Sequence, residues 1–313
     1  MFAAVAIGCR GYDIGLGAEH DMAFDFSQAS LGVLIACPAA NVLRIAALAS
    51  ATDGALDYGT VRELRQEVER GVLDDFHPLD AWPELARGLL GEHPSRMLWA
   101  LRDSGALAVL LPEIDALFGM PQADNQGEMV DIGEHVFRVA DQLARMRAPL
   151  SVRFAGLFYN LGKSDSPPQH LPSHYRHVDR GLPRVEAICA RFDVPPEFRD
   201  LALLATAELE RVHRAAEMRA GSIAALLDRV DAFNRPERFA ELMQLCAADY
   251  RAFPGAGEIY PKARLMETAL RACHELDEDP AQEAASQEER LAACTLAIAT
   301  ALRSMRWSGD EAD

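Results

Sequence analysis

The stretch Val152-Arg153-Phe154-Ala155-Gly156-Leu157-Phe158-Tyr159-Asn160-Leu161-Gly162-Lys163 is the part of this chain that most strongly decides its fold. Its first ten residues are mostly apolar and predict a helix over 152–161. Two polar residues, Tyr159 and Asn160, interrupt the apolar run directly before Leu-Gly-Lys. The rest of the sequence has to show whether this pair belongs to a site with chemistry of its own.

The composition points to a large helical protein. Half of the 313 residues are apolar and only 7% are aromatic, so the chain can bury a sizeable core and favours helix over strand. No apolar run approaches the roughly 20 residues that cross a bilayer. The apolar start, 1–9, lacks a basic region before it, and the six cysteines form no Cys-x-x-Cys pair. We therefore expect a cytoplasmic protein with reduced thiols and no membrane partner.

The charge of the chain restricts its partners. A net charge of −17 argues against broad, non-specific nucleic-acid binding, which depends on neutralising phosphates. One local basic cluster stands out, formed by Arg211, Arg214 and Arg219 with His213. These arginines are candidate RNA phosphate contacts, and the alternative is a solvated helix face.

The apolar periodicity predicts an all-α fold. Helical spacing begins after Asn41, and the next helix is expected over 60–71 with Thr60 as its N-cap. Another helix is expected to be capped by Ser95, and residues 106–127 read as loop-rich because of their prolines and glycines.

Four segments follow from this pattern. We expect an irregular or β-stranded N-terminal remnant (1–36), a helical domain (37–127), a second helical bundle (128–277), and an acidic linker with a last helix (278–313).

Several segments, in this order, resemble the bacterial CCA-adding enzymes, which are tRNA nucleotidyltransferases that carry an HD domain. The resembling segments are Asn41-Val42-Leu43-Arg44-Ile45-Ala46, residues 109–121, Asp131-Ile132-Gly133-Glu134-His135, His174-Tyr175-Arg176-His177, and residues 194–202. The resemblance covers roughly residues 37–270. It implies a neck and body followed by an HD-like bundle.

The resemblance also implies three chemical sites, and the first is the family's catalytic head. That head supplies a Gly-Ser motif and an Asp-x-Asp pair, whose carboxylates hold two Mg²⁺ ions. Residues 1–36 contain neither motif. We therefore expect a truncated relative that lacks the head.

The second site is the neck motif Glu-Asp-x-x-Arg, which pairs with the incoming base in this family. Cys37 and Pro38 stand at the acidic positions and Asn41 stands at the arginine, while Arg44 is retained. Proline has no charge, and an amide cannot replace a bidentate guanidinium. Nucleotide selection is expected to be lost.

The third site is the HD metal centre. His135 matches the first ligand, but Tyr159 and Asn160 replace the His-Asp pair, and the last aspartate would fall near Glu210 or Arg211. Tyr and neutral Asn suit hard divalent ions poorly. These positions are therefore expected to be vestigial, with His135 a satisfied histidine inside the bundle.

Two further features of the HD-like segment could carry chemistry. His174 and His177 could share a helix face and form a relocated metal site, and the alternative is a polar surface loop. Lys163, next to Gly162, could meet a phosphate.

The sequence thus predicts a truncated, catalytically inactive CCA-related protein that binds tRNA or another structured RNA and needs no cofactor. One alternative is an enzyme, either an HD-type phosphohydrolase using Mg²⁺, Mn²⁺ or Ni²⁺ or a nucleotidyltransferase partner subunit. Another is a helical scaffold for a basic protein partner, which the acidic charge would suit. The oligomeric state stays open.

Overall fold

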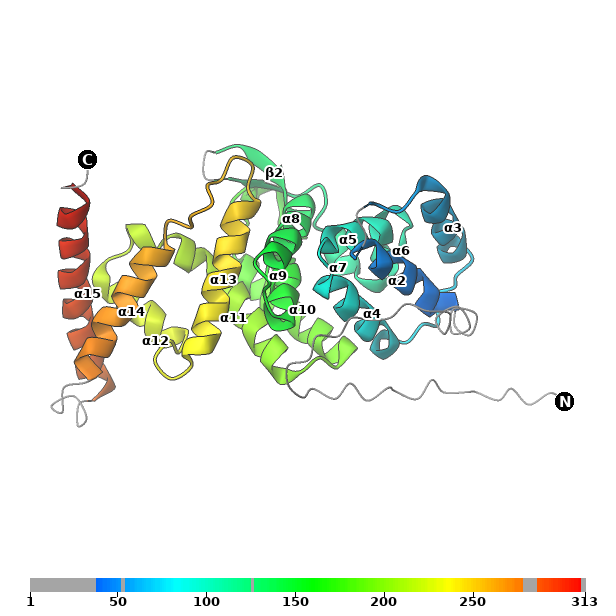
Figure 1. Cartoon of the computed structure of the whole chain (residues 1–313). Helices are drawn as coiled ribbons and strands as arrows, with labels where there is room; N and C mark the ends of the chain where they lie inside the picture. Colours follow the sequence, from blue (N-terminus) through cyan, green and yellow to red (C-terminus); the bar gives the residue numbers. More distant parts are fainter. Residues whose placement is uncertain (1–37, 52–53, 125–126, 278–285, 311–313) are drawn as a thin grey trace. The chain divides into compact units, whose positions relative to one another are not determined.

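The computed structural model describes residues 38–51, 54–124, 127–277 and 286–310, which lie within one compact unit, Cys37–Asp313 (Figure 1). The predicted N-terminal remnant and Cys37 lie outside the described residues, as does most of the predicted acidic linker. The domain boundaries expected at 127 and 277 remain predictions.

The described part of the chain is all-α apart from one short hairpin, which confirms the predicted fold class. The first helices are α2 (Pro38–Ala49), α3 (Tyr58–Glu69), α4 (Pro78–Leu90), α5 (Pro94–Asp103), α6 (Ala106–Leu110) and α7 (Pro112–Asp115). The antiparallel strands β1 (Pro121–Ala123) and β2 (Met129–Asp131) follow, then α8 (Ile132–Arg145), α9 (Leu150–Phe158) and the 3₁₀ turns η1 (Leu161–Lys163) and η2 (Pro168–His170). The remaining elements are α10 (His177–Phe192), α11 (Pro196–His213), η3 (Ala215–Glu217), α12 (Ala220–Arg229), α13 (Pro236–Ala252), α14 (Ala263–Asp277) and α15 (Gln287–Asp310).

Two predicted helix caps were wrong. Asp57, not Thr60, caps α3, and its carboxylate accepts hydrogen bonds from the backbone N–H and the hydroxyl of Thr60. Ser95 lies inside α5, where its N–H and hydroxyl both donate to Asp141 of α8. The segment expected to be loop-rich, 106–127, in fact contains α6, α7 and β1.

Helix α9 is the centre of the bundle and contains the first part of the stretch 152–163. It packs against α4, α8, α11 and α13, and Figure 1 shows it beside α8 and α13. Every residue from Ser151 to Phe158 is buried. Tyr159 and Asn160 follow directly and are also buried. Tyr159 and Asn160 therefore lie in the interior of the protein.

The Leu-Gly-Lys turn after this pair is held by packing against α10. A Cβ atom on Gly162 would lie 1.8 Å from the carbonyl oxygen of His177, so no other residue fits without a backbone shift. Arg180 donates from Nε to the Gly162 carbonyl at 3.0 Å, and Arg184 donates to the Leu161 carbonyl at 3.0 Å. The close packing against α10 therefore requires glycine at position 162, independently of any metal chemistry.

At the C-terminal end of the unit, α15 packs against α12 and α14 (Figure 1). None of the helices in the described residues combines the length and apolar character that crossing a bilayer requires.

Candidate functional site: a buried carboxylate with three donors

Asp249 on α13 is the centre of the most strongly connected polar cluster. Its carboxylate is 5% exposed. Oδ1 lies 2.8 Å from Nε2 of His135 on α8 and accepts the hydroxyl hydrogen of Tyr159 at the end of α9. Oδ2 lies 2.8 Å from Nε2 of His213 on α11. We call these four residues the Asp249 cluster; it joins four helices.

The protons in the Asp249 cluster follow from its geometry. Nδ1 of His135 is buried with no hydrogen-bond partner. A charged imidazole would bury an N–H group without an acceptor there, so the neutral ring with its proton on Nε2 is favoured. Nδ1 of His213 lies 2.8 Å from the hydroxyl of Tyr260, which donates to it when His213 is neutral as well. Both ring nitrogens of His213 therefore have hydrogen-bond partners, Asp249 and Tyr260.

The pKa shifts of the cluster concern its carboxyl and its phenol. Burial alone would raise the pKa of the Asp249 carboxyl, but the two imidazoles hold that pKa well below its usual range. Burial, together with the charge of Asp249, raises the pKa of the Tyr159 phenol well above its usual value. Tyr159 therefore remains a protonated donor.

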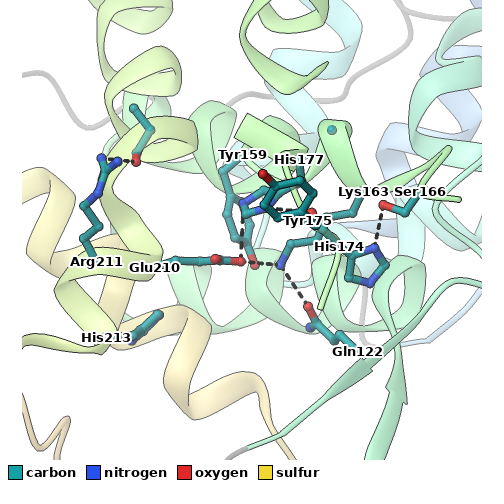
Figure 2. A network of polar contacts seen from close by, with 12 residues as sticks. Gln122, Tyr159, Lys163, Ser166, His174, Tyr175, His177, Glu210, Arg211 and His213 are labelled. Atoms are coloured by element: carbon teal, nitrogen blue, oxygen red, sulfur yellow. Dashed lines mark hydrogen bonds and ion pairs between the residues drawn. The ribbon is translucent and has the colours of Figure 1, made fainter. Parts of the chain in front are cut away.

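A second group of polar residues, which we call the Lys163 cluster, lies beside the first (Figure 2). Nζ of Lys163 is 3.0 Å from Oε1 of Glu210 and donates to Oε1 of Gln122 at 3.2 Å. Nε2 of His177 is 3.3 Å from the same Glu210 oxygen. Burial would raise the pKa of Glu210, but Lys163 and His177 lower it, so Glu210 is anionic.

His174 lies near the Lys163 cluster and hydrogen-bonds to the β1–β2 hairpin (Figure 2). Its Nε2 donates to the Pro121 carbonyl at 2.8 Å, and its Nδ1 accepts from the Ser166 hydroxyl at 2.8 Å. Burial lowers the pKa of both His174 and His177. With Nδ1 of His177 3.2 Å from the His174 carbonyl, all four ring nitrogens face protein atoms.

A small pocket lies between the Asp249 cluster and the Lys163 cluster. Its volume is about 160 Å³. Its walls are formed by Gln122, Ala123, Tyr159, Lys163, Leu209, Glu210, His213, Asp249, Tyr250 and Phe253.

The pocket does not fit the divalent metal that the family resemblance implies. Both oxygens of Asp249 are occupied by hydrogen-bond donors, and Tyr159 keeps its proton. Asn160 adds no charge. Within the described ranges, no three or more His, Cys, Asp or Glu side chains are arranged to hold a metal ion. The cluster is a network of hydrogen bonds instead.

The candidate RNA contacts separate into two kinds. Lys163 is engaged with Glu210, and Arg211 is engaged with the buried Glu208, which also receives Arg229. Arg214 and Arg219 are exposed, and in the described part of the chain neither makes a direct hydrogen bond or ion pair through its side chain.

The neck residues lie apart from the pocket, on α2. Pro38 and Asn41 line a hollow between α2 and α3. Arg44 pairs with Glu84 of α4 at 2.8 Å, so its retained guanidinium has a structural partner.

The sequence did not reveal two members of the Asp249 cluster. The last carboxylate was expected near Glu210 or Arg211, but the carboxylate that meets His135 is Asp249, 114 residues away. His213 was read only as part of a basic cluster. The sequence feature that could have indicated Asp249 is its position directly after Ala247 and Ala248 in an apolar stretch. A carboxylate buried there needs a polar partner.

Comparison with known proteins agrees with the sequence resemblance. No family model matches the chain. The chain is 42% identical to the multifunctional CCA protein of Nitrosospira multiformis over 238 residues, which are 76% of this chain and 58% of that protein. It is 44% identical to that of Cupriavidus necator over 219 residues (70% and 53%) and 41% identical to that of Nitrosomonas eutropha over 238 residues (76% and 58%). The chain therefore spans little more than half the length of these relatives. Over about three quarters of its own length, it is a homologue of the bacterial multifunctional CCA proteins, the CCA-adding enzymes.

Proposed function

We propose that this protein is a CCA-related RNA-binding protein whose HD-like site no longer performs metal catalysis. The observation that carries the proposal is the hydrogen bond from Tyr159 to Asp249. It occupies the position where the family resemblance expects a histidine ligand to meet a metal ion. No cofactor is required, and we expect the protein to act in the cytoplasm.

The loss of catalysis is supported by the hydrogens that Tyr159, His135 and His213 donate to Asp249. A metal phosphohydrolase needs anionic or imidazole ligands that are free to coordinate the ion. Here the phenol of Tyr159 and both imidazoles donate their hydrogens to Asp249, and Asn160 is uncharged. Metal entry would have to break several buried hydrogen bonds, which opposes binding.

RNA binding is supported by ancestry and by two exposed arginines. The homologous proteins carry the name multifunctional CCA protein, which points to tRNA as their substrate. A protein can recognise a tRNA by its shape and backbone without a catalytic carboxylate. Arg214 and Arg219 lie at the α11–α12 connection with guanidinium groups that the rest of the described chain leaves available for phosphates. An RNA contact in so acidic a protein has to be local and specific.

A tRNA titration tests this proposal. The protein is titrated with a transcribed tRNA and with an unstructured RNA of equal length, at low and at moderate salt. We expect tighter binding to the tRNA and a loss of affinity as salt rises, because phosphate contacts release counterions. The variant Arg214→Glu/Arg219→Glu should bind tRNA about tenfold more weakly.

The matched control is Arg62→Glu, which reverses one exposed charge on α3 and should leave tRNA binding near the parent value. Equal affinity for tRNA and unstructured RNA, or no binding at low salt, would reject the RNA-binding function and leave the protein-scaffold alternative.

A further inference from the structure

Helix α15 is apolar on two opposite sides. Its residues 291–302 include no charged side chain, although the helix lies at the C-terminal end of the compact unit (Figure 1). One side packs against the bundle: Ile298 is fully buried, and Leu291, Cys294 and Leu302 are partly buried against the core. This side accounts for the packing of α15 against α12 and α14.

The opposite side of α15 is exposed in the described part of the chain. Leu296 lies two positions before Ile298 and therefore about 160° around the helix from it. Its side chain is 68% exposed, Ala292 is exposed and Ala299 is half-buried. We call the five residues on this side the outer face of α15: Glu289, Ala292, Leu296, Ala299 and Arg303. Their alternating spacing of three and four residues is that of a coiled-coil seam.

We propose that the outer face of α15 binds a second copy of this chain, with the two α15 helices antiparallel and related by a two-fold axis near Leu296. In this arrangement the leucine and the alanines of each copy leave water against those of the other. Small side chains beside the leucine allow the two helices to approach closely. The inference goes beyond RNA binding and does not depend on it.

The two ends of the outer face carry opposite charges that are open to a partner. Arg303 donates within its own helix, from Nε to the Ala299 carbonyl at 3.1 Å and from Nη2 to the Thr300 hydroxyl at 3.5 Å. No carboxylate among the described residues pairs with it. Glu289 accepts the N–H and the hydroxyl of Ser286 through Oε2, both at 2.8 Å, which leaves Oε1 for a further donor.

These charges favour an antiparallel copy over other partners. An antiparallel copy brings Glu289 of each chain within about one helical turn of Arg303 of the other, so both ends gain an opposite charge. A parallel copy would place like charges together at both ends, and these repel. A two-fold axis makes each contact twice from a single sequence. Because one helix pair is a small interface, the dimer should form in a concentration-dependent way.

Sedimentation velocity of the full chain from about 1 to 300 µM tests the inference. We expect the average mass to rise from that of a monomer towards that of a dimer. Leu296→Glu places two like charges near the axis and should keep the chain monomeric up to about 300 µM. The matched control, Leu79→Glu, changes a leucine on α4 that is 45% exposed. Its dissociation constant should stay within about twofold of the parent value.

Arg303→Glu tests the direction of the two helices. It makes both ends of the outer face acidic and should raise the dissociation constant of an antiparallel dimer about fivefold at low salt. The increase should shrink at high salt, because exposed charges are screened. A parallel dimer would exchange one repulsion for another and keep the parent affinity.

The outcomes separate the possible partners. A monomer at every concentration overturns the inference, and so does a dimer that Leu296→Glu leaves unchanged. Parent affinity in Arg303→Glu overturns the antiparallel arrangement. Flotation of a monomeric chain with phosphatidylcholine vesicles would overturn the dimer and assign the outer face to a lipid surface. Thermal unfolding at about 1 µM checks that Leu296→Glu folds like the parent, and Arg303→Glu tests the interface independently. Failure of the dimer leaves the RNA-binding proposal standing.

Discussion

At the residue scale, Tyr159 supplies a buried hydrogen-bond donor to Asp249. Its phenol is buried, and its raised pKa keeps the hydroxyl hydrogen in place for Asp249. Histidine at this position would present a ring nitrogen to an ion, whereas tyrosine presents a donor to a carboxylate. Tyr159 therefore suits a hydrogen bond to Asp249 better than the coordination of an ion.

Tyr159→Phe removes this donor and leaves one oxygen of a buried carboxylate with fewer hydrogen bonds. We expect the free energy of unfolding to fall by about 1–3 kcal/mol, measured by urea denaturation. The control Tyr175→Phe removes the hydroxyl of a residue that is 63% exposed and should change stability by less than about 0.5 kcal/mol. Equal effects of the two variants would contradict a stabilising role for the Tyr159 hydroxyl.

Stability should also depend on pH through the two buried histidines. Burial lowers the pKa of His174 and of His177 in the folded state; nearby Lys163 lowers both further, Arg180 also lowers that of His174, and Glu210 opposes the shift. The unfolded chain therefore takes up these protons first as the pH falls. The stabilisation is complete above about pH 6.5 and is lost as the pH drops through the folded pKa values.

Thermal unfolding between pH 5 and 7.5 measures this dependence. We expect the melting temperature to fall on the acidic side of about pH 6.5, and the fall to be smaller in the double variant His174→Gln/His177→Gln. An identical pH slope in parent and variant would contradict the assignment. Asp249 acts in a separate window, because its lowered pKa gives stability that is lost only at much lower pH.

At the residue scale, the sequence alone could identify the changed positions but not their new partners. The departure from the family pattern at Tyr159 and Asn160 stays a prediction. His135 lies inside the bundle as expected, but it is not fully satisfied, because its Nδ1 has no hydrogen-bond partner. Asp249 and His213 could not be assigned, because their contacts join residues far apart in sequence. Such contacts follow from helix packing, which local periodicity does not encode.

Arg153 links two elements and shows why α9 holds its position. Arg153 is 7% exposed, and no carboxylate among the described residues pairs with it. Its guanidinium donates to the backbone carbonyls of Leu89, Gly91 and Ala148. Leu89 and Gly91 lie at the end of α4, whose last carbonyls lack helical partners. Arg153 thereby caps one helix from the interior of another.

Arg153→Met keeps most of the apolar volume and removes these donors. We expect the free energy of unfolding to fall by about 3 kcal/mol, because several backbone carbonyls lose a hydrogen bond in the interior. The matched control, Arg145→Met, changes an exposed arginine in the last turn of α8 and should cost less than about 1 kcal/mol. Urea denaturation measures both, and equal losses would contradict the capping role.

At the element scale, the existence of the helices was predictable and their ends were not. The apolar spacing predicts the long helices of the bundle, and they are present. Thr60 was misassigned as a cap because Asp57, three residues earlier, provides the carboxylate. Ser95 was misassigned because its partner, Asp141, lies on another helix. In both cases a cap depends on which oxygen reaches the N–H group.

At the scale of the whole molecule, homology supports the helical scaffold but does not determine the chemistry of the pocket. The chain is clearly related to CCA proteins, but it spans little more than half of their length. Within the described part, the helices persist while the pocket has a filled hydrogen-bond network around Asp249. The resemblance predicted an all-α bundle, whereas the contacts of Asp249 depend on how α8, α9, α11 and α13 pack together.

We propose that the pocket beside Asp249 no longer supports metal-dependent phosphate chemistry. The most direct test measures phosphate release from 2′,3′-cyclic nucleotides and from nucleotides with added Mn²⁺, Ni²⁺ or Mg²⁺. We compare the parent with Asp249→Asn and with the restored variant Tyr159→His/Asn160→Asp. We expect the parent to release no more phosphate than Asp249→Asn with any of these metals. Metal-dependent release by the parent that Asp249→Asn abolishes would contradict it.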